Sequence, residues 1–429
     1  MSRNIAASAK SRIKTHNVRI DIFGGERDYC VDSVAFRNDN GTLVSTYSAP
    51  EYDAGTTTIS PAFADYIPEV EMAASVHGSG KVCFNTLYGE FVTEVKIDSY
   101  CNPFFYTRWE NGESKCVYIG GERVYHLPDF EDFPLRYTAY CGVLHGGRLF
   151  IRDYDDGYLI RWTCTDFDET DYRSWDESID GGGHLRLDVE GGPVLWMHSL
   201  GTDIVIFRET GITELHAAME PRLFSLGKTT YRFYNYIGVK GSAVCGGKVW
   251  FCTEDSVYSF DGNSIERLKL ERFMNLYTFK GVKAHNDRFL YFHCYRGGSH
   301  YLCEYDIFTK RSTVFGKGGQ AVWRYYDNLL IVIDRGVKFM ETDSMCDYRL
   351  WKSEAIDLGT NAEKTLKRLI VDCDSEIEVS VVTDNGKTCS TIKSGKYNVG
   401  LTGTAFTFSF KGYGSVFKVT AEWEVKDDL

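Results

Sequence analysis

The sequence predicts an all-β protein: a β-propeller of six or seven blades, followed by a small C-terminal antiparallel β-sandwich. Aromatic residues make up 15% of the 429 residues, and glycine occurs 41 times whereas proline occurs 8 times. Aromatic side chains suit a pleated, half-buried surface and glycine supplies tight turns, so this composition indicates many short strands. A turn-and-strand pattern also recurs roughly every 40–55 residues, the spacing of four-stranded propeller blades.

The repeating unit is a polar turn, an apolar strand, a second turn and a second strand. A single blade cannot bury both of its faces, so successive blades must stack around an axis. We expect the inner strand of each blade to be the most apolar, as in the run Leu329–Ile333. Helical periodicity with caps is missing, so little helix is expected. The copies begin at Gly78-Ser79-Gly80, Gly146-Gly147, Gly201-Thr202, Gly246-Gly247, Asn286-Asp287 and Tyr326-Asp327.

Three segments are expected along the chain. Residues 1–16 form a basic N-terminal arm, and residues 17–354 form the propeller. The propeller segment opens with an alternating strand at 17–23, and its residues 38–70 are expected to hold loops and short strands. Residues 355–429 form the sandwich. The basic residues of the arm are Arg3, Lys10, Arg12 and Lys14.

The sandwich is predicted from strict alternation of apolar and polar residues after Trp351. The turn Asp384-Asn385-Gly386 is a strong hairpin signal between two such runs, because type I′ turns favour Asn-Gly. Strands are expected at 366–372, 377–382, 405–414 and 416–423.

Charge and cysteine usage limit the possible functions. The net charge is −12, so the chain is poorly suited to gripping nucleic acid, which needs clustered Lys and Arg. The acidity suits a soluble surface or a channel wall that repels DNA. The 13 cysteines include no C-x-x-C pair and are expected to be reduced, buried small hydrophobes, which favours folding in a cytoplasm. Neither a signal peptide nor membrane insertion is expected.

The acidic stretch 153–190 is the first candidate site. Its Asp166-x-Asp168-x-x-Asp171 could offer oxygens to Ca²⁺, but it lacks the glycine and the distal glutamate of an EF-hand. We interpret the stretch as a solvated acidic insertion and expect no metal.

The run Asp171-Tyr172-Arg173-Ser174-Trp175 is the second candidate, because it is faintly similar to the Asp-box turn of sialidase propellers. It occurs once and in the wrong residue order. A sialidase would also need an arginine cluster, a nucleophilic tyrosine and a partner carboxylate, which no spacing identifies. We therefore assign no catalytic residue.

Other short motifs favour structure over chemistry. Gly78-Ser79-Gly80-Lys81 is not a Walker loop, because Ser75 and Val82 stand where the pattern needs Gly and Ser or Thr, so we expect a hairpin turn. Gly316-Lys317-Gly318-Gly319 is interpreted as a flexible turn. The ten histidines are scattered, so no metal site and no cofactor are expected. Three strand aromatics, Trp250, Tyr258 and Trp323, are expected in the core.

Several runs resemble propeller proteins of tailed-bacteriophage virions, namely the tail nozzle or packaged-DNA stabilisation proteins of the head–tail junction. The similarity covers roughly residues 140–425 and is a pattern of turns and strands. The runs are 191–195, 200–207, 238–244, 249–251 and 257–262 in the propeller, and 351–359, 367–369, 401–405 and 412–416 after it.

The resemblance implies a structural virion protein and no enzyme. Such a protein forms a ring, here expected to be a hexamer, beside the portal, adaptor or other tail proteins. The ring extends the channel through which double-stranded DNA passes without sequence-specific binding, and it retains the packaged genome until ejection. Assembly would take place in the cytoplasm of the bacterial host.

Two other functions stay open on the residues. A carbohydrate- or protein-binding propeller would gather exposed aromatics at one end of its axis. A sialidase-like glycoside hydrolase would bring Arg and carboxylate side chains together at the axis.

Overall fold

The computed structural model divides the chain into two compact units. One unit is Tyr47–Ser344, and the other combines Met1–Thr46 with Met345–Leu429. The structure describes residues 15–23, 30–34, 36–39, 42–45, 59–77, 80–86, 90–98, 100–110, 112–177, 181–217, 220–227, 231–232, 237–253, 255–285, 287–317, 321–325, 328–333, 336–340, 349–412 and 414–426.

Seven antiparallel sheets follow one another along the described part of the Tyr47–Ser344 unit, and we number them blades 1 to 7. Blade 1 consists of β5 (Ile59–Ile67), β6 (Met72–His77), β7 (Lys81–Thr86) and β8 (Phe91–Lys96). Blade 2 consists of β9 (Phe104–Glu110), β10 (Glu113–Gly120), β11 (Arg123–Leu127) and β12 (Glu131–Pro134). Blade 3 consists of β13 (Ala139–His145), β14 (Arg148–Asp153), β15 (Leu159–Trp162) and β16 (Gly183–Arg186).

Blade 4 has five strands, and blade 7 has three in the described residues. Blade 4 consists of β17 (Val194–Leu200), β18 (Asp203–Arg208), β19 (Gly211–His216), β20 (Ser225–Leu226) and β21 (Tyr231–Arg232). Blade 5 consists of β22 (Ile237–Cys245), β23 (Lys248–Thr253), β24 (Val257–Phe260) and β25 (Ile265–Arg267). Blade 6 consists of β26 (Thr278–His285), β27 (Phe289–Arg296), β28 (Ser299–Asp306) and β29 (Arg311–Lys317). Blade 7 consists of β30 (Ala321–Tyr325), β31 (Asn328–Ile333) and β32 (Gly336–Met340).

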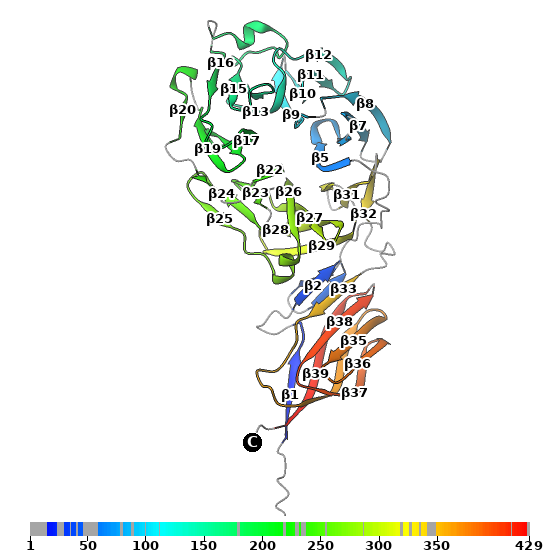
Figure 1. Cartoon of the computed structure of the whole chain (residues 1–429). Coiled ribbons are helices and arrows are strands. Elements are labelled where there is room, and N and C mark those ends of the chain that lie inside the picture. The colour runs from blue at the N-terminus through cyan, green and yellow to red at the C-terminus, as the bar shows by residue number, and fades with distance from the viewer. Residues whose placement is uncertain are drawn as a thin grey trace, which may run out of the picture. The chain divides into compact units, whose positions relative to one another are not determined.

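The blades form a closed ring. In Figure 1 the first strands of the blades surround the centre, and the last strands lie on the perimeter. β30 of blade 7 lies beside β5 of blade 1, which closes the ring. This arrangement is a β-propeller. The predicted fold class is confirmed, and the described residues contain seven blades.

Helix is confined to short 3₁₀ turns in the described residues, as the sequence predicted. They are η1 (Pro68–Val70), η2 (Tyr172–Trp175), η3 (Pro221–Leu223) and η4 (Arg272–Leu276).

Two-residue hairpin turns explain the repeat seen in the sequence. Gly146 and Gly147 have φ of 55° and 74°, and they join β13 to β14 with His145 opposite Arg148. A type I′ turn needs positive φ at both central residues, which glycine adopts without strain. The repeats identified in the sequence did not include blade 2, although Gly112 follows an asparagine in its first hairpin. The turn at Gly112 is separated from the next one, at Gly146, by fewer residues than the expected period of roughly 40–55.

The second strand of blade 4 is more buried than its first strand. All four residues of Ile204–Phe207 in β18 are buried, whereas Trp196 and His198 of the first strand β17 are half-buried. A second strand is covered on both faces by neighbouring blades, while a first strand borders the axis. The run Leu329–Ile333, given as the example of an apolar inner strand, belongs to the second strand β31 of blade 7.

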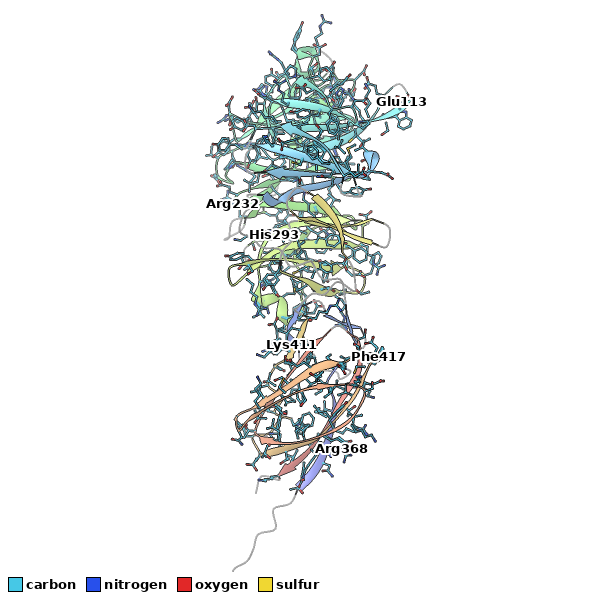
Figure 2. All side chains as sticks on the ribbon, turned by 90° about the vertical axis from the view of Figure 1, so that its right-hand side faces the viewer. Glu113, Arg232, His293, Arg368, Lys411 and Phe417 are labelled. Atoms are coloured by element: carbon cyan, nitrogen blue, oxygen red, sulfur yellow. The ribbon has the colours of Figure 1, made fainter. Side chains whose placement is uncertain are left out.

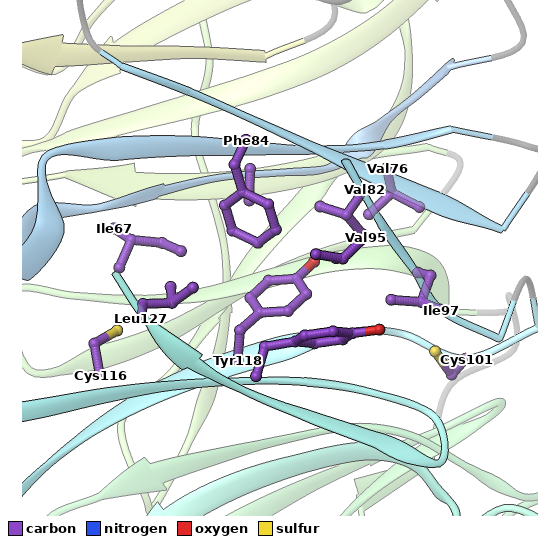
Figure 3. Packing of buried hydrophobic residues seen from close by; sticks show 12 residues of the cluster. Ile67, Val76, Val82, Phe84, Val95, Ile97, Cys101, Cys116, Tyr118 and Leu127 are labelled. Atoms are coloured by element: carbon purple, nitrogen blue, oxygen red, sulfur yellow. The ribbon is translucent and has the colours of Figure 1, made fainter. Parts of the chain in front are cut away.

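Hydrophobic side chains fill the space between adjacent blades. Figure 3 shows the cluster between blades 1 and 2, where Phe84 of β7 lies edge-to-face on Tyr118 of β10 with ring centroids 5.2 Å apart. Truncation of such a buried aromatic to alanine costs about 3–5 kcal/mol. Cysteines contribute to these interfaces, since nine of the twelve that the structure describes are buried.

The second unit is a sandwich of two sheets. Phe408 of one sheet lies edge-to-face on Trp423 of the other at 6.1 Å between ring centroids, and both side chains are buried. One sheet contains β3 (Phe36–Asp39), β4 (Thr42–Ser45), β39 (Val416–Lys426), β34 (Lys364–Cys373) and β37 (Gly395–Gly403), with β1 (Thr15–Asp21) also on β39. The other contains β2 (Cys30–Val34), β33 (Leu350–Ser353), β38 (Phe406–Gly412), β35 (Ile377–Thr383) and β36 (Lys387–Ile392).

The expected boundary at residue 17 differs from the structure. The strand predicted at 17–23 forms, but it pairs with β39 along its whole length, from Thr15 opposite Lys426 to Asp21 opposite Thr420. β2 likewise pairs with β33. Both chain ends therefore build the sandwich, and the propeller is an insertion in it. Thr15 and His16, assigned to the arm, begin β1, while residues 1–14 lie outside the described residues.

Charged side chains reinforce the docking of β1. Glu422 on β39 lies 3.8 Å from Arg19 of β1 and 3.4 Å from Arg368 of β34, which Figure 2 labels. Lys418 of β39 lies 3.8 Å from Asp21. Exposed pairs of this kind contribute about 0–1 kcal/mol each to the free energy of folding. Their main effect is therefore to favour this register of β1 against β39.

Candidate functional site

Part of the acidic stretch 153–190 pairs with arginines, while Asp155, Asp166 and Asp168 are exposed to solvent. Asp153 lies 2.7 Å from Arg161, and Asp156 pairs with Arg186 of β16. The buried Arg208 of the next blade lies 3.2 Å from Asp188. The hydrogen bond from Arg208 lowers the pKa of the Asp188 carboxyl. The carboxylates therefore hold turns and strands together.

The three aspartates considered for Ca²⁺ do not converge. Asp168 Oδ1 accepts hydrogen bonds from Thr170 N at 2.8 Å and Thr170 Oγ1 at 2.7 Å. Asp171 Oδ1 accepts from Arg173 N at 3.0 Å and caps η2. Across the described residues, no group of three or more His, Cys, Asp or Glu side chains is placed to hold a metal ion.

The Asp171–Trp175 run is a packing element. It forms η2 within the β15–β16 connection, residues 163–182, and Trp175 is buried. Trp175 Nε1 donates to Glu169 O at 3.2 Å, and its ring lies 5.7 Å from Tyr137 between centroids. The run thus fixes the connection against the segment that enters blade 3.

A buried Tyr–Glu–Arg cluster, which the sequence analysis missed, joins this connection to blade 2. Tyr106 of β9 donates a hydrogen bond to Glu169, and Arg108 Nη1 lies 3.0 Å from Glu169 Oε1. Arg108 also donates to Phe167 O at 2.7 Å. Burial and the neighbouring Glu169 raise the pKa of the Tyr106 phenol well above its usual value. No sequence spacing could show the cluster, because Tyr106 and Glu169 are brought together by tertiary packing.

These are the residue types that a sialidase-like hydrolase would require, but they are closed to substrate. Tyr106 is 5% exposed and Glu169 is 1% exposed. The cluster holds two blades together through the contacts of Glu169 with Tyr106 and Arg108.

The remaining sequence candidates are structural where the structure describes them. Gly80 and Lys81 end the hairpin between β6 and β7, with His77 opposite Lys81, so the predicted turn is confirmed. Trp250 is buried and donates from Nε1 to Cys245 O at 2.9 Å. Tyr258 stacks on Phe251 with 5.6 Å between centroids. Gly316 and Lys317, predicted to lie in a turn, end strand β29, while Gly318, Gly319 and the Trp323 side chain lie outside the described residues.

The first strands carry bulges where they begin. The register shifts at Tyr140 in β13, at Leu195 in β17 and at Lys280 in β26. A bulge leaves one residue unpaired and re-aims its side chain, and it also frees backbone groups. The bulged residues therefore present groups to the centre of the ring.

Asn102, just before β9, uses two of these freed carbonyls. Its backbone N donates to Tyr140 O at 2.6 Å, and its Nδ2 donates to Leu195 O at 3.2 Å. Asn102 of blade 2 thus reaches blade 4 past blade 3, which is possible only near the axis, where the first strands converge. Arg152 of β14 lies with its guanidinium carbon 3.9 Å from the centroid of the Tyr140 ring. We name Asn102, Tyr140, Arg152 and Leu195 the axial cluster.

Histidines further along the first strands join neighbouring blades. His198 Nε2 lies 2.8 Å from Ser242 Oγ of blade 5, and His145 Nδ1 lies 2.8 Å from Ser199 Oγ of blade 4. Burial, together with the charge of Lys283, lowers the pKa of His198 to about 3. Both histidines act as neutral polar links inside the ring.

No protein-family model matches the sequence, and no curated protein matches it. Solved structures that resemble the chain include BBS1N in complex with ARL6DN, at 11% identity and a TM-score of 0.47, covering 70% of this chain and 98% of that chain. The Pan2 WD40 domain of Neurospora crassa matches at 9% identity and a TM-score of 0.45, covering 68% of this chain and 90% of that chain. PorZ of Porphyromonas gingivalis matches at 14% identity and a TM-score of 0.41, covering 78% of this chain and 45% of that chain. These likenesses concern the fold alone.

No helix in the described residues has the length and apolar character needed to span a membrane.

Proposed function

We propose that this chain is a structural virion protein, a ring-forming tail nozzle or head–tail junction subunit that retains the packaged genome until ejection. The sequence resemblance over residues 140–425 supports this role, and the acidity of the chain is compatible with DNA sliding past it. The proposal includes no catalytic activity.

The observation that carries the proposal is the partition of charge between the two units. The sandwich unit holds 18 basic and 18 acidic residues, whereas the propeller unit holds 30 and 42. The whole net charge of −12 therefore belongs to the propeller. A wall of that charge repels DNA, so the genome could slide past it without adhering.

The experiment is a comparison of phage particles with and without the protein. We expect mass spectrometry of gradient-purified particles to detect the chain, and particles from a deletion mutant to lose their DNA. Absence of the chain from particles, or full retention of DNA without it, would count against the proposal. Turnover of aryl glycosides by the purified chain would overturn its non-enzymatic part.

A binding propeller is the second candidate, and it would be favoured by exposed aromatics gathered at one end of the axis. Tyr100 and Trp109 are each 75% exposed. They do not gather at one end, because Tyr100 precedes β9 and Trp109 lies near the far end of that strand. Strong, selective signals on a glycan array would favour this candidate over the virion role.

A further inference from the structure

Arg152 has no carboxylate partner in the described part of the chain. Its Nε is buried and makes no hydrogen bond there, and its guanidinium contacts the ring of Tyr140. The buried Arg148 also lacks a carboxylate there, but its Nη1 donates to Thr163 O at 2.9 Å and to Gly181 O at 2.8 Å. Arg161, by contrast, lies 2.7 Å from Asp153, and Arg108 lies 3.0 Å from Glu169. A partly desolvated charge is costly unless a counter-charge is supplied, so this position calls for an anion.

The guanidinium is held in place before any ligand arrives. A Cβ on Gly157 would lie 2.8 Å from Arg152 Nη2 and 2.8 Å from Pro193 Cβ, so the guanidinium packs closely against the backbone of Gly157. On the other side, Tyr140 is fixed by its bulge and by the hydrogen bond from Asn102. Pre-positioning of this kind reduces the entropy lost on binding.

The acidity of the propeller unit, which holds 42 acidic and 30 basic residues, selects the kind of anion. A dianion would be repelled more strongly by this unit than a monoanion. The planar fork of arginine matches the two oxygens of a carboxylate.

We propose that the axial cluster binds a small monovalent carboxylate through Arg152, with Tyr140 supporting the guanidinium. This inference does not depend on the virion role, because it concerns the side chains of one subunit. It would give the propeller a ligand-responsive point where blades 2, 3 and 4 meet.

The test is calorimetric titration of the full chain with acetate at pH 7 and constant ionic strength. We expect saturable binding in the millimolar range, the affinity that one ion pair can supply. Acetamide, the neutral analogue, should not bind. Arg152→Gln should weaken acetate binding at least tenfold, and Arg152→Lys should weaken it several-fold because the fork is lost. The matched control is Arg136→Gln, which removes an exposed arginine over Tyr137 and should leave binding unchanged.

Two results would overturn the proposal: no saturable acetate binding to the wild type, or equal binding by Arg152→Gln. Tighter binding of phosphate than of acetate would overturn the choice of a monoanion. Circular dichroism and the melting temperature show whether each variant folds. If Arg152→Gln does not fold, Gly157→Ala provides the second arm, because it keeps the charge but displaces the guanidinium and should also weaken binding.

Discussion

At the scale of single residues, Lys364 shows how backbone carbonyls can hold a buried ammonium. Its side chain is fully buried in the sandwich, and Nζ donates to Thr360 O at 2.6 Å, Ala362 O at 2.8 Å and Thr404 O at 2.7 Å. The ammonium has three donors, and these carbonyls use all of them. Lys364 thereby ties two loops to β34.

Lys364→Met should lower the free energy of unfolding of the sandwich by about 3–5 kcal/mol, because it leaves three carbonyls without a donor. The measurement is chemical denaturation followed by the fluorescence of Trp351 and Trp423, the buried tryptophans of this unit. Lys367→Met is the control, since Lys367 is exposed and paired with Glu424, and it should cost less than about 1 kcal/mol. Equal costs for the two variants would contradict the role of Lys364.

His198 should make the propeller less stable as the pH falls. Burial lowers its folded pKa to about 3, whereas an unfolded histidine titrates near pH 6.5. Between these values the unfolded chain takes up a proton that the folded chain excludes, so stability is lost as the pH falls below about 6.5. The charge of Lys283 opposes protonation in the same direction.

His198→Asn should flatten this pH dependence by up to about 1 kcal/mol per pH unit. The measurement is the unfolding free energy between pH 6.5 and 4.5. His184→Asn is the control, because His184 is exposed and pairs with Glu177. An unchanged slope in His198→Asn would show that this imidazole is not protected from protons in the folded state.

At the scale of structural elements, the β15–β16 connection acts as a clamp between blades 2 and 3. Its Glu169 is the centre of the clamp, because it joins Tyr106 and Arg108 of β9 to Trp175 of its own segment. Glu169→Gln removes the charge opposite a half-buried arginine. We expect a loss of about 2–4 kcal/mol in propeller stability.

Denaturation of Glu169→Gln beside Glu177→Gln measures this clamp. Glu177 lies on the same connection but is exposed, so its substitution should have little effect. Similar losses for the two variants would mean that the connection is not a clamp.

β1 should be essential to the sandwich although it lies more than 300 residues from its neighbours in sequence. It pairs along β39, and Phe23, just after it, lies 4.9 Å from Trp351 between ring centroids. Deletion of residues 1–23 should expose the β39 edge and one face of Trp351. Hydrogen exchange of the β39 amides should then accelerate at least tenfold.

Deletion of residues 1–14, which keeps β1 whole, is the control and should leave that exchange unchanged. If removal of β1 does not alter exchange in β39, the sandwich is complete without the N-terminal strands, as the sequence boundary at 355 assumed.

Local patterns predicted the elements well, whereas long-range pairings could not be predicted. Asn385-Gly386 and the alternation at 377–382 identify a hairpin, because both signals are local. β1 looks the same in sequence whether it pairs within the propeller or with β39, since alternation fixes its faces but not its partner. Arg152 carried no signal, because its lack of a carboxylate partner depends on which blades lie beside it.

At the scale of the whole molecule, the chain is a propeller inserted into a sandwich, with all of its net charge in the propeller. The sandwich is closed by strands from both chain ends. In the proposed ring, the neutral sandwich is free to form contacts between subunits, and the acidic propeller supplies the repulsive surface. Repulsion between propellers should weaken as salt screens it.

Mass photometry of the purified full chain tests the central claim most directly. The account predicts a closed ring, with a main species at six times the 48.8 kDa of one chain, persisting from low to physiological salt. A single species at 48.8 kDa at every concentration and ionic strength would contradict it.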